Sequence, residues 1–154
     1  MHARSKTLAT WIALFGGTLG LHRMYLKGWR DPWAWLHLLP TGLGLVGLQR
    51  FREIGPDDAL TWVLMPLLGL MVVQAMLHAI VYGLTPDEKW AARWQQPVQP
   101  SGWGAVFGVI AALLLGATAL MSSIAFGVQK FFEWQLQPTT TSSAADHPSS
   151  RDSA

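Results

Sequence analysis

The stretch Gly16–Gly28, GGTLGLHRMYLKG, decides how this chain is organised. An apolar run over 8–21 stops at His22 and Arg23, and a second apolar run opens at Trp33. Cations and a tyrosine are typical of the boundary between hydrocarbon and head groups, and glycines allow close approach or a tight reversal of the chain. The stretch therefore predicts a short connection between two membrane-buried helices.

The same residues carry a resemblance to a known family. The string G-x-x-G-x-H-R-x-Y-L-x-G resembles that of the TM-two domain family, whose members have two membrane helices joined by a short loop. Met24 stands where the family usually has Phe, and Lys27 separates Leu26 from the final glycine. The resemblance covers roughly the first third of the chain and implies a membrane module without a reaction. The matching residues are Gly17, Gly20, His22, Arg23, Tyr25, Leu26 and Gly28.

Composition agrees with a membrane protein. Of the 154 residues, 51% are hydrophobic and only 13% are charged, and the charges avoid four long stretches. The net charge of +2 is too small to suggest a nucleic-acid surface. The absence of cysteine excludes disulfides, thiolate metal sites and cysteine catalysis. The first apolar run leads into His22 rather than into a cleavage site, so we expect a retained helix and not a signal peptide.

The expected fold class is all-α, an integral membrane helical bundle with about four transmembrane helices and one short interfacial helix. The expected organisation is a TM-two-like helical hairpin with a charged connector (1–58), a third membrane helix (59–84), an interfacial helix with a Pro-rich loop (85–102), a fourth membrane helix (103–134) and a disordered Ser/Thr/Pro-rich tail (135–154).

The first two membrane segments are short. The run over 8–21 would be about 21 Å of helix against a hydrocarbon core of about 30 Å. Gly16 and Gly20 have the G-x-x-x-G spacing that lets another helix come close, either in this chain or in a second copy. In the second segment, 33–48, Pro40 is expected to kink or break the helix.

Two local patterns have simple explanations. Gly42, Gly44 and Gly47 spell the dinucleotide-binding string G-x-G-x-x-G, but they lie in a membrane-like run without a strand before them, so we reject that function. Asp57 or Asp58 is expected to cap the helix that follows, rather than to bind a metal.

The third segment, 59–84, is long enough to span and carries polar side chains at membrane depth. Gln74 and His78 are four residues apart and share a helix face, and His37 of the second segment is a possible partner. Hydrogen bonding between helices is the simpler interpretation. A proton relay or a metal site is the alternative, although two histidines and a glutamine make a poor metal set.

The last third of the chain predicts an interfacial helix and a further span. Thr85-Pro86-Asp87-Glu88 has the form of a capping box, and the helix after it would place Trp90 and Trp94 on one face, in the membrane interface. The run over 103–128 contains no charge. Small residues recur along it every four positions and predict a close helix contact, within this chain or with another: Gly104, Gly108, Ala112 and Gly116.

Four crossings would place both termini on one side and five Lys or Arg residues near each side, so the positive-inside rule does not choose an orientation. The family resemblance suggests that the loop with His22 and Arg23 faces the cytoplasm. The expected location is a membrane, the plasma (inner) membrane of a bacterium.

We expect a non-enzymatic multi-pass membrane protein that acts through helix–helix association, as an adaptor or a small oligomer. Its partners would be the lipid bilayer and other membrane proteins or itself, with no nucleic acid and no cofactor; Arg23 is a candidate for contacting a lipid phosphate or a partner's carboxylate. The alternative function is a small transporter or channel that uses His37, Gln74 and His78 as a polar path. An enzyme is not expected, since no H-E-x-x-H or G-x-S-x-G motif is present.

Overall fold

The computed structural model describes residues 4–136, and this part of the chain is all-helical, with no strand. The expected all-α class is therefore confirmed. The helices are α1 (Lys6–Gly16), α2 (Leu21–Lys27), α3 (Pro32–Leu36), α4 (Leu38–Glu53), α5 (Ala59–Leu84), α6 (Asp87–Trp94) and α7 (Trp103–Leu136). The tail expected to be disordered, 135–154, lies outside the described residues apart from its first two positions.

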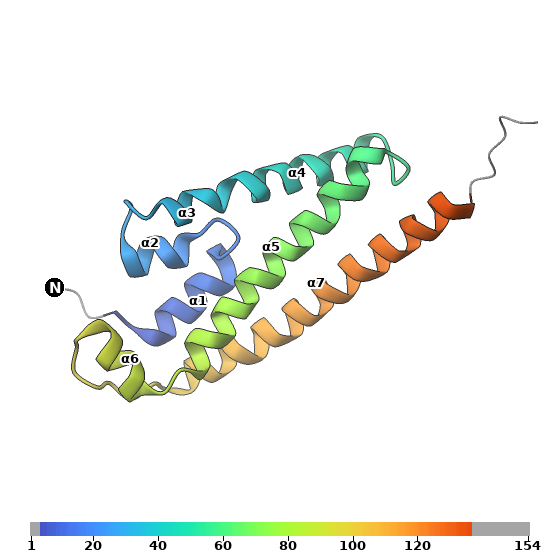
Figure 1. Cartoon of the computed structure of the whole chain (residues 1–154). Coiled ribbons are helices and arrows are strands. Elements are labelled where there is room, and N and C mark those ends of the chain that lie inside the picture. The colour runs from blue at the N-terminus through green and yellow to red at the C-terminus, as the bar shows by residue number, and fades with distance from the viewer. Residues whose placement is uncertain (1–3, 137–154) are drawn as a thin grey trace, which may run out of the picture.

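Helix α5 is the centre of the arrangement. Helices α4 and α7 pack along it, and α1 packs against both α5 and α7 in the half of the molecule near α6 (Figure 1). The main core lies between α1, α5 and α7 and consists mostly of small and flexible side chains: Ala13, Leu14, Ala75, Met76, Ala79 and Ala112. Small residues allow these helices to approach closely.

The helical bundle has two opposite ends (Figure 1). One end, which we call the α6 end, holds the first described residues, the loop between α2 and α3, and α6 with the segments beside it. The other, which we call the far end, holds the α4–α5 loop and the last turns of α7. Charged side chains gather at both ends, and the helices between them expose mainly large apolar side chains.

The N-terminal hairpin differs from the expected crossing helix. Helix α1 ends at Gly16, and α2 runs back so that its last turn lies beside the start of α1 (Figure 1). The backbone N–H of Ser5 donates to the hydroxyl of Tyr25 at 3.1 Å, and Leu26 packs against Ala9. The apolar run over 8–21 therefore does not form one continuous helix, because the glycine-rich turn interrupts it five residues before its end.

The second segment is also interrupted. Helix α3 ends at Leu36 and α4 begins at Leu38, so the break falls just before Pro40. A proline ring clashes with the carbonyl four residues earlier, which here belongs to Leu36, and it offers no N–H donor. The expected break at this proline is confirmed, although it lies upstream of the ring. In α5, by contrast, Pro66 is accommodated within a continuous helix.

Capping was predicted correctly at one helix and wrongly at another. The carboxylate of Asp58 accepts from the backbone N–H of Thr61 at 3.0 Å and caps α5, so the capping expectation is confirmed for Asp58. The Thr85 hydroxyl does not cap α6; it donates to the carbonyl of Val81 at 2.6 Å. Thr85 is the C-cap residue of α5, and its hydroxyl therefore bonds to a carbonyl of the last turn of α5 and not to an N–H of α6.

Two described helices are long and apolar enough to cross a membrane, Ala59–Leu84 and Trp103–Leu136. Of their most apolar windows, 22% and 28% are buried inside the protein. The expected bundle of four such helices is not confirmed, since α1 has 11 residues and α4 has 16. These two apolar helices are compatible with a membrane protein.

The small residues of α7 form helix contacts within this chain. On α7, Gly108 faces Thr10 and Gly116 faces Met76, so the stripe of small residues packs against α1 and α5 of the same chain. Gly16 and Gly20 do not share a helix face, because α1 ends at Gly16 and Gly20 precedes α2 with a positive φ of 76°. Their expected role as one packing surface is wrong.

Candidate functional site: a histidine cluster below a basic cavity

The turn between α1 and α2 places the site. Gly20 adopts a left-handed conformation, and a Cβ atom there would lie 2.5 Å from the carbonyl oxygen of Ala34. Gly17 is equally close to α5, with 2.6 Å between its hypothetical Cβ and that of Ala75. Glycine is thus needed at both positions for α2 to fold back between α3 and α5. This turn carries His22 into the interior.

His22 is fully buried and is the centre of a cluster of rings. Its ring centroid lies 4.7 Å from that of His78, 5.8 Å from that of His37 and 5.9 Å from that of Tyr82. Gln74 joins the cluster, with 3.5 Å between its Nε2 and the Nε2 of His37. The structure therefore brings together the three polar residues expected at membrane depth, and it adds His22 and Tyr82 to them.

The hydrogen bonds of the cluster fix how its rings are presented. His37 donates from Nδ1 to the carbonyl of Trp33 at 2.6 Å, and His78 donates from Nδ1 to the carbonyl of Gln74 at 2.9 Å. Because a carbonyl only accepts, both rings keep Nε2 as an acceptor in the neutral form. Both ring nitrogens of His22 are buried without a partner in the described part of the chain. Three histidine rings thus meet at one point, and the ring of His22 has its hydrogen-bonding capacity unused.

Sequence reasoning missed His22 as a cluster member. The string His-Arg predicts an interfacial turn, because a histidine beside an arginine after an apolar run resembles a membrane boundary. The signal that could have found it is the glycine-rich turn at Gly16, Gly17 and Gly20, which ends α1 early and turns His22 inward. Among residues 4–136, no three histidine or acidic side chains are arranged to hold a metal ion.

A cavity of about 250 Å³ lies next to the cluster, at the α6 end. Its walls include the aromatic side chains of Tyr82, Trp90 and Trp94, and His78 is shared with the cluster. Three cations line the cavity, together with aliphatic residues and no carboxylate: Arg23, Lys27 and Arg93. Arg23 comes from the family-like string and Arg93 from α6, so the fold brings together segments that are far apart in sequence.

Arg23 is held in place by an ion pair of this chain. Its Nε donates to the carboxylate of Asp31 at 2.8 Å. This contact uses one edge of the guanidinium. The structure thus supplies an internal carboxylate for Arg23, where a partner's carboxylate was one of the expected contacts.

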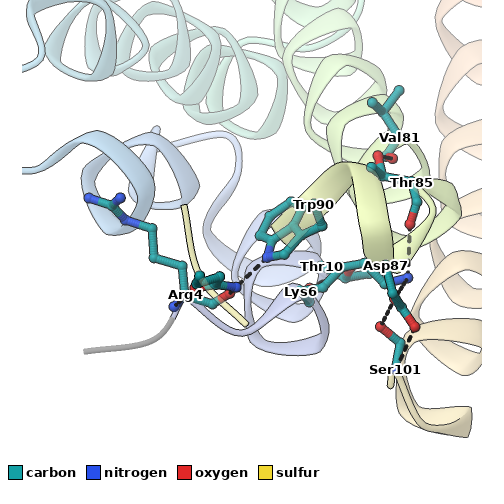
Figure 2. Close-up of polar contacts among 9 residues, drawn as sticks. Arg4, Lys6, Thr10, Val81, Thr85, Asp87, Trp90 and Ser101 are labelled. Carbon is teal, nitrogen blue, oxygen red and sulfur yellow. Dashed lines mark hydrogen bonds and ion pairs between the residues drawn. The ribbon is translucent and has the colours of Figure 1, made fainter. Parts of the chain in front are cut away.

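The N-terminal segment is fastened to α6 and to the loop before α7 (Figure 2). Lys6 donates to Asp87 at 2.7 Å, and Asp87 also accepts from the hydroxyl and the N–H of Ser101. These hydrogen bonds lower the pKa of the Asp87 carboxyl to about 2, with the Lys6 contact as the largest cause. The indole N–H of Trp90 donates to the carbonyl of Arg4 at 2.7 Å.

The tryptophans of α6 pack against the N-terminal hairpin and the end of α5. Trp90 is buried against Leu26 and Tyr82, and the guanidinium of Arg4 lies 4.4 Å from the ring centroid of Trp94. The helix expected at 85–95 exists, but its aromatic face seals the N-terminal hairpin. That this helix lies in the membrane interface stays a prediction.

The remaining residues of the family-like string support the hairpin. Gly28 ends α2 with a φ of 91°, while Tyr25 and Leu26 contact the start of α1. The string thus forms a short helix where a loop was expected. Comparisons with family models, curated proteins and solved structures gave no match. Membership of the TM-two domain family stays a prediction.

Proposed function

We propose that the protein is a non-enzymatic, multi-pass membrane protein in which three segments cross the bilayer and the α1–α2 hairpin enters and leaves on the same side. The crossing segments are α3 with α4, α5, and α7. Residues 33–48, which contain no Lys, Arg, Asp or Glu, would be about 24 Å long as helix and come close to a hydrocarbon core of about 30 Å, whereas α1 would reach only about 16 Å. The exposed apolar side chains between the two charged ends support this placement.

The re-entrant hairpin changes the count of positive charges. With α2 folded back, seven described cations lie at the α6 end: Arg4, Lys6, Arg23, Lys27, Arg30, Lys89 and Arg93. Three lie at the far end: Arg50, Arg52 and Lys130. Lys and Arg favour the cytoplasmic side of a membrane. The proposed orientation therefore places the α6 end in the cytoplasm, and the inner membrane of a bacterium stays the predicted location.

The proposed action is association with a helix of a partner membrane protein. The small-residue stripe of α7 packs against α1 and α5 of the same chain, so a partner helix would have to bind another surface. A groove of about 350 Å³ remains between α5 and α7 towards the far end, and Gly69, Ala119, Ser122 and Ser123 line it. It lies on the two helices apolar enough to cross a membrane. Small residues at such a place allow close helix approach, and this observation carries the proposal.

Photocrosslinking in intact cells tests the association. A probe at Ser122, which lines the groove, is compared with a probe at the neighbouring exposed Met121, which does not. We expect one discrete adduct with another membrane protein from Ser122 only, and its loss when Ala119→Leu, at a half-buried position that lines the groove, fills it. Gly42→Leu, at an open position of α4, should leave the adduct intact. Lipid adducts alone, or an adduct of twice the chain mass, would overturn the partner-helix proposal.

The alternative, a small transporter or channel, is favoured by one observation. A string of polar side chains leads inward from the basic cavity through His78, His22 and His37 to Gln74. Purified protein in liposomes should then show flux that His78→Ala abolishes. If the protein is folded but shows no flux, the transporter or channel alternative is refuted and only the association proposal remains.

A further inference from the structure

The cavity at the α6 end has the chemistry of an anion site. Arg23, Lys27 and Arg93 line it, and its lining contains no carboxylate. Asp31 offsets the charge of Arg23 from outside the lining, whereas Lys27 and Arg93 form no ion pair with another described residue. Two cations without an ion pair among the described residues therefore remain at a cavity of about 250 Å³.

Two of the three cations are positioned by different contacts. Asp31 orients Arg23 at 2.8 Å, and α6 carries Arg93 on a helix that Trp90 anchors to the Arg4 carbonyl. The cavity therefore depends on the folded hairpin and not on one flexible loop. Arginine favours phosphate because its planar fork can donate two parallel hydrogen bonds to phosphate oxygens.

The walls of the cavity favour an amphipathic ligand. Leu26 and Val81 are aliphatic, and Tyr82, Trp90 and Trp94 present rings with a polar edge. Such rings are common where hydrocarbon meets head groups, and basic pockets between membrane helices on the cytoplasmic side bind anionic head groups. A soluble phosphate compound would use the cations but not the aliphatic wall.

We infer that this cavity binds the phosphate group of an anionic phospholipid in the leaflet at the α6 end. The phosphate lies between Lys27, Arg93 and the free edge of Arg23, and the acyl chains leave along Val81 of α5. The inference rests on the proposed membrane placement, and it names a ligand for a surface that the helix association does not use.

The test is native mass spectrometry of the purified full-length protein titrated with phosphatidylglycerol. Lys27→Gln and Arg93→Gln are the variants, because both side chains are exposed and their removal leaves the packing intact. Lys89→Gln is the matched control, since it removes the same charge from the same helix outside the cavity. A basic residue near an anionic surface contributes about 1 kcal/mol, so each cavity variant should weaken binding about fivefold.

Each outcome decides the inference. Weakened binding in the two cavity variants, unchanged binding in Lys89→Gln and no retention of phosphatidylethanolamine support it. Equal weakening by Lys89→Gln overturns it, because the charge then acts without a site. Displacement of the lipid by excess inorganic phosphate assigns the site to a soluble phosphate and overturns the lipid source. Wild-type protein that stays in carbonate-washed membranes but retains no phosphatidylglycerol refutes this inference and leaves the proposed function standing.

Discussion

The contact between α4 and α5 makes opposite predictions for two glycines on one helix. Gly47 is buried, and a Cβ atom there would lie 2.4 Å from the Cβ of Leu64 and 3.0 Å from its carbonyl carbon. Gly42 is exposed and has nothing within 4 Å of its hypothetical Cβ. The same substitution, glycine to alanine, therefore tests the close approach of the helices in one case and only helix propensity in the other.

The expected magnitudes follow from these two environments. Gly42→Ala should raise the free energy of unfolding by about 0.5–1 kcal/mol, because alanine is the better helix former. Gly47→Ala gains the same propensity but forces α4 away from the backbone of α5. Overpacking costs about 1–3 kcal/mol, so we expect a difference of about 1–3 kcal/mol between the variants and a net loss of up to about 2 kcal/mol for Gly47→Ala.

The assay is thermal unfolding of the purified protein in detergent, followed by tryptophan fluorescence. Gly42→Ala should unfold at a slightly higher temperature than the wild type, and Gly47→Ala at a clearly lower one. Equal shifts of the same sign would refute the close packing of α4 on α5, because both positions would then behave as open helix surface.

Three further predictions use the same measurement. Asp58→Ala should lower the free energy of unfolding by more than the cost of a lost cap, about 0.5–2 kcal/mol, because it removes both the cap on α5 and the ion pair with Arg50. Asp58→Asn, which can still cap the helix, should restore the share of the cap; equal effects of the two variants would contradict the capping. Gly116→Ala should destabilise the protein, since its Cβ would lie 2.9 Å from a side-chain carbon of α5, and Gly127→Ala should not, because its surroundings are open; a stable Gly116→Ala variant would argue against the α5–α7 contact. Because the pKa of Asp87 is lowered, its contribution to the free energy of unfolding is fully present above about pH 4 and is lost as the pH falls towards 2. Asp87→Asn should remove this part of the pH dependence. An unchanged dependence of stability on pH in this variant would refute the ion pair between Lys6 and Asp87.

Sequence reasoning predicted the elements better where a strong local signal existed. The long helices over 59–84 and from 103 onwards follow from long apolar runs that open without a charged residue, and the break near Pro40 follows from proline chemistry. The path of 8–27 could not be predicted in the same way. A glycine-rich turn within an apolar run fits both a loop beyond a crossing helix and a reversal within the bundle, and only the contacts of Tyr25 and Leu26 with α1 select the reversal.

The candidate site was accessible to sequence reasoning only in part. The spacing of Gln74 and His78 placed them on one face, and the structure brings His37 to that face. His22 was missed because its position depends on the reversal, which is a tertiary feature. The role of Gly44 and Gly47 was missed for a similar reason: their closeness to Leu68 and Leu64 depends on how α4 lies on α5, which no local pattern states.

The most direct test of the account is the side of the membrane on which the N-terminal segment lies. The chain has no cysteine, so Arg4→Cys, Arg30→Cys and Glu53→Cys each introduce a single thiol for a membrane-impermeant maleimide. In intact cells, the account predicts labelling of Glu53→Cys alone and labelling of all three variants after the cells are opened. Labelling of Arg4→Cys together with Glu53→Cys, with Arg30→Cys protected, would show that the first hairpin crosses the membrane and would contradict the re-entrant fold.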